Sequence, residues 1–245
     1  MNEGSSQTMR FSIIIPARNE ERFIVRCLKS IRAAARSFAG EIEIVVSLNR
    51  CTDRTEEIAK SYGAVIVRND SKNLSMIRNA GAKAAHGDII VTIDADSWMS
   101  PNMLTEIDRF IRSGRYIGGG VMMYPERLSL GIISTILLIF PVILMHRVIS
   151  GGLFWCLRSD FEAIQGFDES LVSVEDIDFA RRLRIYGKTK RKRLATITKA
   201  HIMTSCRKFD IFGDWYILKN PRLTHKIFQG RDEKAANGFF YDVPR

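Results

Sequence analysis

The residues best suited to chemistry are Asp94 and Asp96, two carboxylates separated by a single alanine. They follow 88–93, a run rich in isoleucine and valine that is too short for an ordinary helix and predicts a buried strand. Ligands of an open parallel sheet bind beyond the carboxyl ends of its strands, which is where this pair lies. Two acids at this spacing can reach a divalent cation and the oxygen-rich ligand that it holds. The alternative is an acidic turn that only closes the strand.

The elements that must position these acids alternate between strands and helices. The sequence predicts strands at 11–15, 42–48, 64–68 and 88–93, and helices between them at 19–37, 55–62 and 74–85. Thr52 or Asp53 is the expected N-cap of the second helix. This alternation predicts βαβ crossovers, and therefore an α/β fold with a mainly parallel central sheet and helices on both faces.

Beyond Pro101 the pattern is less regular. Strands are expected at 116–123 and 153–157, and helices at 102–113, at 160–164 and from 174 through 184, with Gly187 as a stop signal. Glu175 and Asp176 open the last of these helices. Acids in a first turn stabilise the positive end of a helix dipole, so this pair has a purely structural interpretation.

The stretch 128–149 is the most apolar part of the chain. Its middle, 131–145, contains no charged residue and is shorter than the roughly 20 apolar residues that a spanning helix needs. A buried or interfacial helix is therefore favoured over a span. Burial in the core, contact within a homodimer and contact with a membrane surface all remain open. The tail from 211 mixes aromatic residues with Lys and Arg, as an amphipathic surface segment would.

Composition limits the class of protein and of partner. A chain of 245 residues, 46% hydrophobic and 26% charged, is long enough for one α/β domain with a sizeable core. Its formal charge of +10 indicates an anionic partner, which charge alone leaves as a phosphorylated ligand, a lipid surface or nucleic acid. Four scattered cysteines without a C-x-x-C pair indicate neither a zinc site nor a disulfide framework, and favour a reducing compartment. The N-terminal residues do not have the pattern of a secretory signal.

Five motifs, taken in order, resemble a family 2 glycosyltransferase with the GT-A fold. They are FSIIIPARNEE, NRCTDRTEEIA, SMIRNAGAKAAHGDIIVTIDAD, GGLFWCLRSDFEAIQGFDE and VEDIDFARRLRIYGK. Each is weak alone, but five in the expected order are specific. The resemblance covers about residues 10–210. It implies a Rossmann-like sheet with a nucleotide-sugar-binding half, 10–100, and an acceptor-binding half, 101–210, before a short amphipathic C-terminal extension, 211–245.

The resemblance implies a nucleotide-diphosphate-sugar donor and a bound Mn²⁺ or Mg²⁺, which neutralises the leaving diphosphate. Asp96 matches the metal ligand of the family, and Asp94 its companion on the donor side. Some members complete the metal shell with a C-terminal histidine, so His201, expected just after the last strand, is a candidate ligand. A structural histidine is the alternative. Arg207 and Lys208 are expected to close over the diphosphate.

Residues of three further segments match the family's donor pocket. The matching positions are Pro16, Ala17 and Glu20 in the turn after the first strand, Asp53 in the loop after the second strand, and Arg78 in the helix before the metal site. A solvated helix position is the alternative for Arg78. The family's second-strand loop usually begins with adjacent acids, whereas this chain has Leu48 and Asn49 there. Uracil specificity is therefore not implied.

The chemical step requires a base that takes the proton of the acceptor hydroxyl. Glu175 and Asp176 match the E-D motif of the family, which implies that Asp176 is the base of an inverting displacement and that Glu175 supports it or contacts the acceptor. The helix-dipole interpretation remains as the alternative. The Q-x-x-R-W signature of processive synthases is absent after this pair, so a single addition is expected.

These expectations define a transferase with a nucleotide-diphospho-sugar donor and a glycan or lipid-linked acceptor. We expect a cytoplasmic location, with peripheral contact to the inner face of the membrane through 128–149 and the C-terminal segment, and no nucleic-acid partner. One alternative is a nucleotidyltransferase, although its glycine-rich phosphate loop is missing where this chain reads PARNE. Another is a non-catalytic protein of the same fold that binds a membrane or nucleic acid through its basic surface.

Overall fold

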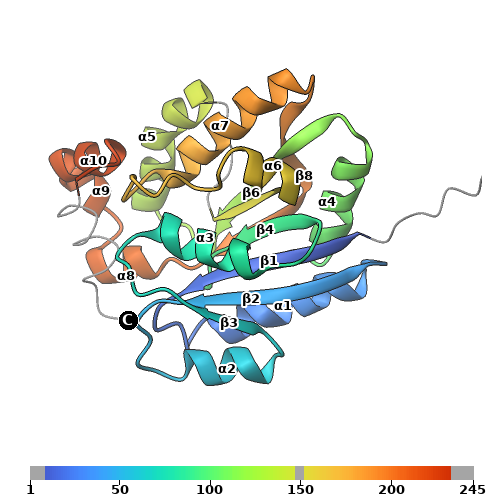
Figure 1. Ribbon diagram of the computed structural model, residues 1–245. Coiled ribbons are helices and arrows are strands. Elements are labelled where there is room, and N and C mark those ends of the chain that lie inside the picture. Colours follow the sequence, from blue (N-terminus) through green and yellow to red (C-terminus); the bar gives the residue numbers. More distant parts are fainter. Residues whose placement is uncertain (1–8, 147–151, 233–245) are drawn as a thin grey trace, which may run out of the picture.

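The computed structural model describes residues 9–146 and 152–232, in which eight strands form one sheet flanked by helices (Figure 1). The strands are β1 (Arg10–Ala17), β2 (Glu41–Leu48), β3 (Val65–Arg68), β4 (Ile89–Ile93), β5 (Ser97–Met99), β6 (Tyr116–Pro125), β7 (Leu153–Leu157) and β8 (Arg193–Thr204). The larger helices are α1 (Ile24–Arg36), α2 (Thr55–Ser61), α3 (Leu74–Ala84), α4 (Met103–Arg112), α5 (Leu130–His146) and α7 (Glu175–Thr189). The shorter ones are α6 (Arg158–Ala163), α8 (Arg207–Phe212), α9 (Tyr216–Lys219) and α10 (Pro221–Phe228).

The first half of the sheet is parallel, and three of its strands, β1, β2 and β4, are largely buried on both faces, whereas β3 at the edge is partly exposed. β2 and β4 pair with β1 on either side, and β3 pairs with β2. Alternate residues of β1 enter two separate cores: Phe11 and Ile13 pack in the core shared with α1 and α4, and Ile14 packs in the core shared with α7. Strands buried in this way consist of nearly continuous apolar runs, which is why the sequence revealed them.

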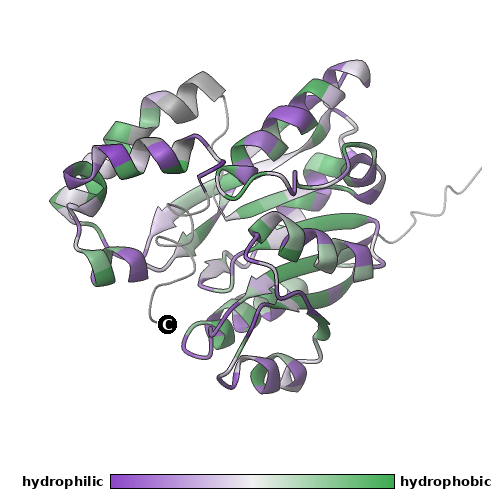
Figure 2. Cartoon of the chain, turned by 60° about the vertical axis from the view of Figure 1, so that its left-hand side comes forward, coloured by the Kyte–Doolittle hydropathy of each residue, from purple (hydrophilic) through white to green (hydrophobic). Residues whose placement is uncertain are grey.

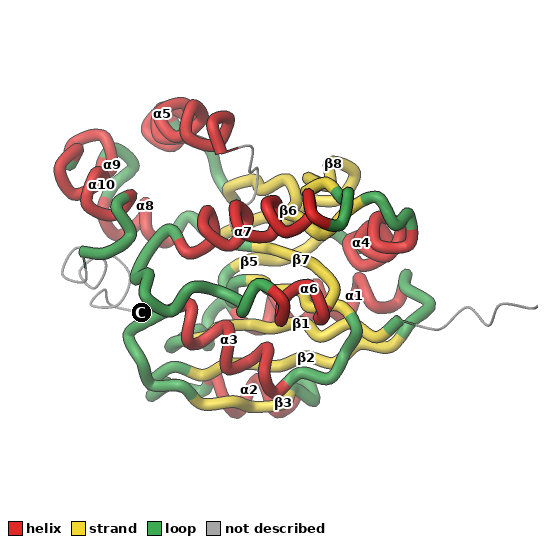
Figure 3. The backbone as a smooth tube through the Cα atoms, turned by 45° about the horizontal axis from the view of Figure 1, so that its top comes forward, coloured by secondary structure: helices red, strands yellow, loops and turns green. Residues whose placement is uncertain are grey.

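The second half of the sheet mixes directions. β7 lies antiparallel between β4 and β6, β8 runs parallel to β6, and β5 pairs antiparallel with β8. The strand order is β3-β2-β1-β4-β7-β6-β8-β5. Figure 3 shows α1, α2 and α4 on one side of the sheet, and α3, α6 and α7 on the other. The predicted α/β class, with a mostly parallel sheet between two helical layers, is confirmed.

Several predicted boundaries need correction. The first helix begins at Ile24 instead of 19, after a loop in which Asn19 has a positive φ of 49°. The N-cap of α2 is Arg54, while Asp53 accepts a hydrogen bond from the Thr55 N–H. α7 continues through Gly187 to Thr189. A Cβ at Gly187 would lie 2.9 Å from Cγ2 of Ile117, so this glycine lets the helix pack closely on β6 and is not a stop signal. β5, which was not predicted, is only three residues long.

The apolar stretch 128–149 forms α5 as far as His146, and 147–149 lie outside the described residues. Most of the large side chains of α5 that the structure describes are exposed, for example Leu130 at 76% and Leu137 at 66%. Ile132 and Thr135, in contrast, are buried against the protein. The buried-core alternative is therefore wrong for the part of α5 whose side chains the structure describes, 130–138 with Phe140 and Pro141. Within 9–146 and 152–232, no helix is both long and apolar enough to cross a membrane.

The C-terminal helices lie next to α5. Figures 1 and 3 show α8, α9 and α10 on the same side of the molecule as α5, and Figure 2 shows the hydrophobic α5 beside these more hydrophilic helices. The domain boundary predicted at 210/211 falls inside α8. The C-terminal part of the predicted extension, 233–245, lies outside the described residues.

Candidate active site

The loops that carry the predicted site residues meet at the carboxyl edge of the parallel strands. β1 and β2 end in register, with Ala17 opposite Leu48, and β4 ends beside β1. The turn at Asp94 follows β4 directly. It is held by the Asp94 N–H, which donates to the Gly152 carbonyl at 3.1 Å, and by the Asp94 carbonyl, which accepts from Ser97 at 3.0 Å.

Arg78 joins the two acidic pairs. Its side chain is only 3% exposed, and its Nη2 and Nη1 donate to Asp94 Oδ1 and to Glu175 Oε1, each at 2.8 Å. Burial lowers the pKa of this guanidinium, but the Asp94 and Glu175 carboxylates outweigh it and raise the pKa above its usual range. The guanidinium also lies 5.2 Å from the Phe167 ring centroid. Arg78 is therefore a buried cation between the two motifs, and the alternative of a solvated helix position is wrong.

Asp176 is the second residue of α7, and the N-cap of this helix, Val174, adopts a left-handed conformation with φ at 53°. Its Oδ1 accepts the Ile177 N–H at 2.8 Å. Burial and the neighbouring Glu175 carboxylate raise the pKa of Asp176 to about 7, although Arg78 opposes the shift. A carboxyl group with a pKa near neutrality suits proton transfer, because it is both available and sufficiently basic.

A second arginine connects the first-strand loop to the metal motif. Arg207 holds Glu20 through two bonds, Nη1 to Oε2 at 2.7 Å and Nη2 to Oε1 at 3.1 Å. Its Nη2 also lies 3.1 Å from Asp96 Oδ2, which in addition accepts the Ser205 hydroxyl at 3.0 Å. The guanidinium lies 5.1 Å from the Phe23 ring centroid. Glu20 is thus buried against Arg207, and its carboxylate is engaged within the site.

The predicted donor loops are fixed to one another by side-chain bonds. Asp53 accepts the N–H groups of Glu21 and Thr55, both at 3.0 Å. Burial raises the pKa of Asp53, but the hydrogen bonds from Thr55 and Glu21 outweigh it, so the pKa is lowered. The Thr55 hydroxyl in turn accepts the Glu20 N–H at 2.7 Å. Pro16 and Ala17 close β1 at the base of this loop.

Asn49 occupies the position where the family usually has an acid. It is buried, and its Nδ2 donates to the carbonyls of Asn69 and Ser71, both at 2.7 Å. Its N–H donates to the Ala17 carbonyl at 2.8 Å. The side chain therefore ties the loop after β2 to the loop after β3, which is a structural use of an amide at this place, and the backbone N–H connects the same loop to the end of β1.

His201 does not reach the metal motif. It lies within β8, where its N–H donates to the Ser100 hydroxyl, and its ring lies 5.5 Å from that of Tyr124. The strand was expected to end before it, but β8 continues to Thr204 because it pairs with β5 as well as β6. Ser205, four residues further on, and Arg207 are the residues after β8 that contact Asp96. Four residues of a strand span about 13 Å, so the His201 imidazole lies away from Asp94 and Asp96.

The carboxylates present fit a hard cation such as Mg²⁺ or Mn²⁺. The residues that the structure describes contain no cluster of three or more His, Cys, Asp or Glu side chains that could hold a metal by themselves. Mg²⁺ is often held by one or two carboxylates, with the remaining ligands supplied by substrate phosphates and water. Asp94 and Asp96, on either side of Ala95 at the sheet edge, offer that number of carboxylates. Sequence reasoning missed Gly152 and Ser205 here, since neither has a side chain that signals chemistry.

Known proteins resemble this chain in sequence. Residues 12–135, about half of the 245, match the family model described as glycosyl transferase family 2. The dolichol-phosphate mannosyltransferase of Pyrococcus furiosus is 29% identical over 175 residues, which cover 65% of this chain and 49% of that protein. The chain spans about half or less of the length of the curated relatives it matches.

Solved structures show the same fold. The mannosyltransferase PcManGT of Pyrobaculum calidifontis, in complex with GDP-Man and Mn²⁺, superimposes with a TM-score of 0.65 at 17% identity, over 94% of this chain and 65% of that one. TarS of S. aureus, in complex with UDP-GlcNAc, gives 0.62 at 18% identity over 80% and 58%. The motifs, the family match and the shared GT-A fold lead to one conclusion: the chain belongs to glycosyl transferase family 2.

Proposed function

We propose that this chain transfers a sugar from a nucleotide-diphosphate donor to an acceptor hydroxyl, in a single inverting displacement. The observation that carries the proposal is the buried Arg78, which holds Asp94 of the D-x-D motif and Glu175 of the E-D motif at 2.8 Å each. One guanidinium thereby fixes the donor-side acid relative to the acids that would receive the acceptor. A fold retained only for binding does not require this link between the two motifs.

The donor would lie over the loops that follow β1, β2 and β4. Glu20, Asp53 and Asp94 lie on these loops and support a site for the nucleoside and the sugar. TarS and PcManGT were solved with UDP-GlcNAc and GDP-Man, so the fold accommodates both a pyrimidine and a purine donor. Asn49 in this chain makes structural bonds where an acid is usual. The identity of the base is therefore left to the ligand screen below.

Asp96, with Asp94 beside it, would hold Mn²⁺ or Mg²⁺ together with the diphosphate. Such a cation acts as a Lewis acid that stabilises the charge of the departing diphosphate. Arg207 lies within hydrogen-bond distance of Asp96 and can add a second positive charge there, because guanidinium groups bind phosphate oxygens well. His201 has no part in this proposal.

Asp176 would act as the base. Its carboxylate takes the proton of the acceptor hydroxyl as that oxygen forms a bond to the anomeric carbon, and the bond from this carbon to the diphosphate oxygen breaks. Attack from the side opposite the leaving group inverts the anomeric configuration. Glu175 is held by Arg78 and so positions the start of α7. The raised pKa of Asp176, about 7, means that the base is charged above neutrality.

The acceptor is proposed to be a glycan or a lipid-linked precursor of the cell envelope. The Pyrococcus relative is named for a dolichol-phosphate acceptor, which is a lipid-linked phosphate. In this chain, α5, which carries exposed apolar side chains, lies on the same side of the molecule as α8, which begins at Arg207 of the site (Figure 1). An acceptor presented at a membrane surface would be reached from that side.

A thermal-shift screen of UDP, GDP, CMP and dTDP, each with and without Mn²⁺, tests the proposal. A ligand that binds only the folded state raises the apparent stability by RT ln(1 + [L]/Kd), about 2.7 kcal/mol at 100 times Kd. We expect one nucleoside diphosphate to raise the melting temperature, and to do so more strongly with Mn²⁺. The Asp96→Ala variant should lose the additional metal-dependent shift. No shift with any nucleotide in either condition would contradict the proposal.

A further inference from the structure

Helix α5 presents an apolar surface that nothing in the described structure covers. Its large exposed side chains, among those that the structure describes, are Leu130, Ile133, Ile136, Leu137, Leu138 and Phe140. The sequence of α5 contains no Asp, Glu, Lys or Arg. An exposed patch of this kind marks a surface that contacts a protein or a membrane.

The patch contacts the C-terminal helices. Arg127, just before α5, forms ion pairs with Asp210 at 2.6 Å and with Asp214 at 2.8 Å. A Cβ at Gly131 would lie 2.6 Å from the Asp214 carbonyl oxygen, so glycine allows the start of α5 to touch the chain after α8. The two helical segments therefore form one surface, which we call the α5 platform: α5 together with residues 207–228.

The charges around the α5 platform identify what it faces. Exposed basic residues are supplied by α9 and α10: Lys219, Arg222 and Lys226. Asp210 and Asp214, acids of the same segment, share the positive charge of Arg127, and Lys226 forms an ion pair with Asp232 at 3.2 Å. Lys219 and Arg222 therefore supply most of the positive charge that an anion would meet. An apolar helix bordered by basic side chains is complementary to anionic headgroups above acyl chains. Trp215, 45% exposed beside these helices, is a residue type enriched at that interface.

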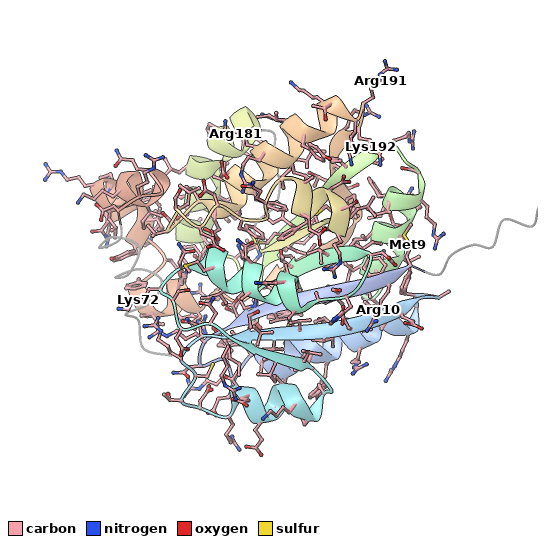
Figure 4. All side chains as sticks on the ribbon, viewed as in Figure 1. Met9, Arg10, Lys72, Arg181, Arg191 and Lys192 are labelled. Atoms are coloured by element: carbon pink, nitrogen blue, oxygen red, sulfur yellow. The ribbon has the colours of Figure 1, made fainter. Side chains whose placement is uncertain are left out.

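A second copy of the chain fits the platform less well. In a two-fold dimer the same patch meets itself, so the basic residues of α9 and α10 would approach their own copies. Positive charge alone does not select the platform, because Arg191 and Lys192 lie at the far side of the molecule (Figure 4). The platform is distinguished by having exposed apolar residues and basic residues together.

We propose that the α5 platform docks on the surface of an anionic lipid bilayer. α5 lies in the interface with its buried residues, Ile132 and Thr135, toward the protein. α8, which begins at Arg207 of the site, belongs to the same platform, so docking places the carboxyl edge of the sheet near the headgroups. The consequence that the acceptor is carried by the membrane rests on the proposed function, whereas docking itself does not.

Flotation of the full chain with lipid vesicles tests the docking. Vesicles of phosphatidylcholine alone are compared with vesicles that also contain phosphatidylglycerol, at low and at high salt. We expect binding to the mixed vesicles that weakens as salt increases. Leu137→Glu should weaken this binding at least about tenfold, because an apolar side chain is replaced by a charge of the wrong sign. The matched control is Ile185→Glu, at an exposed position on α7, which should bind as the wild type does.

The basic residues are tested separately. The double variant Lys219→Gln, Arg222→Gln should weaken binding by about 30-fold, since each charge near an anionic surface contributes roughly fivefold. Arg191→Gln, Lys192→Gln carries the same change of charge and should leave binding unchanged. Circular dichroism and thermal melting confirm that each variant is folded.

Three outcomes would overturn the docking proposal: no binding to mixed vesicles at low salt, equal loss in the platform and control variants, or a stable dimer that Leu137→Glu dissociates in light scattering. Nucleotide binding, measured by calorimetry without vesicles, reports on the proposed function independently. Nucleotide binding without vesicle binding removes the platform proposal alone, and vesicle binding without nucleotide binding removes the transferase proposal alone.

Discussion

Arg207 Nη2 lies 3.1 Å from Asp96 Oδ2, although 111 residues separate the two in the sequence. The same guanidinium holds Glu20 through two further bonds. Asp96, the acid expected to hold a metal ion, and Arg207, the arginine expected to contact the diphosphate, thus share a hydrogen bond. Because a cation at Asp96 would compete with Arg207 for the carboxylate, we expect the guanidinium to turn toward the diphosphate when the donor complex forms.

The Arg207→Gln variant tests this competition. Removal of the positive charge should strengthen Mn²⁺ binding in the absence of nucleotide by a few-fold, because Asp96 is no longer paired. Affinity for the nucleoside diphosphate should fall about tenfold, since a hydrogen bond to a charged group contributes roughly 1.5 to 3 kcal/mol. Calorimetry and the electron paramagnetic resonance of Mn²⁺ measure the two effects. Lys29→Gln, on the exposed side of α1, is the control with the same change of charge. If the affinities for Mn²⁺ and for the nucleoside diphosphate both fell or both rose, the expected movement of Arg207 from Asp96 to the diphosphate would be contradicted.

Asp94 and Asp96 should differ in their roles. Asp96→Asn should abolish the metal dependence of nucleotide binding, because the amide is a poor ligand and its neighbour Asp94 is engaged by Arg78. Asp94→Asn should retain metal-dependent binding of the nucleoside diphosphate but bind the complete nucleotide sugar less well. Calorimetric titrations of both ligands, with and without Mn²⁺, distinguish the variants. Identical behaviour of the two would show that the acids act as one unit.

Arg78→Met should destabilise the fold. It leaves Glu175 and Asp94 without their cation, and breaking a buried ion pair in this way costs about 3 kcal/mol or more. Arg78→Lys should be intermediate, because an ammonium group lacks the fork that reaches both carboxylates. Urea denaturation gives the free energy of unfolding. Arg181→Met, at a largely exposed arginine of α7, is the control and should change it by less than about 0.5 kcal/mol.

The pH dependence of transfer should report on Asp176. With a pKa raised to about 7 by burial and by Glu175, the base is protonated in acid, so kcat/KM should rise with pH through about 7 and then level off. The positive charge of Arg78 lowers the pKa of Asp176. In Arg78→Lys, a positive charge that lies farther from Asp176 should therefore move the pH profile to higher pH. A profile that is flat between about pH 5 and pH 9 would exclude Asp176 as the base.

The same pKa has a consequence for stability. The folded chain holds the Asp176 proton to higher pH than the unfolded chain, so this group stabilises the fold in acid and loses that contribution as the pH rises through about 7. Asp176→Asn cannot titrate. Relative to the wild type, it should therefore gain stability on going from about pH 5 to about pH 8, as measured by chemical denaturation at both pH values. A constant difference between the two proteins would show that the pKa is not raised.

The strands that position the site were predictable because their environment marks their sequences. β1, β2 and β4 are buried on both faces and so consist of apolar runs, and acids placed directly after such a run must lie at the carboxyl edge. β5 has three residues and no apolar run in its sequence, so it is recognised as a strand only by its pairing with β8. The same pairing extends β8 past His201, which carried this histidine away from its predicted position.

The pairings within the site were not predictable. Arg78 and Arg207 were expected to face the donor, but the sequence does not show that each would bind two carboxylates of this chain. Glu20 and Arg207 are 187 residues apart, and their contact depends on the packing of the whole sheet. The exposure of α5 was undetermined for a related reason, since an apolar helix has the same sequence whether a core or a membrane covers its side chains.

The most direct test of the central claim is the release of nucleoside diphosphate by Asp176→Asn in the presence of acceptor, with the donor identified by the thermal-shift screen. Because Asp176 is proposed as the base and not as a donor ligand, the variant should bind the donor with unchanged affinity. Its turnover should fall at least about 100-fold, the usual contribution of a general base. Unchanged turnover in a folded variant that binds the donor normally would contradict the assignment of Asp176, and with it the proposed mechanism.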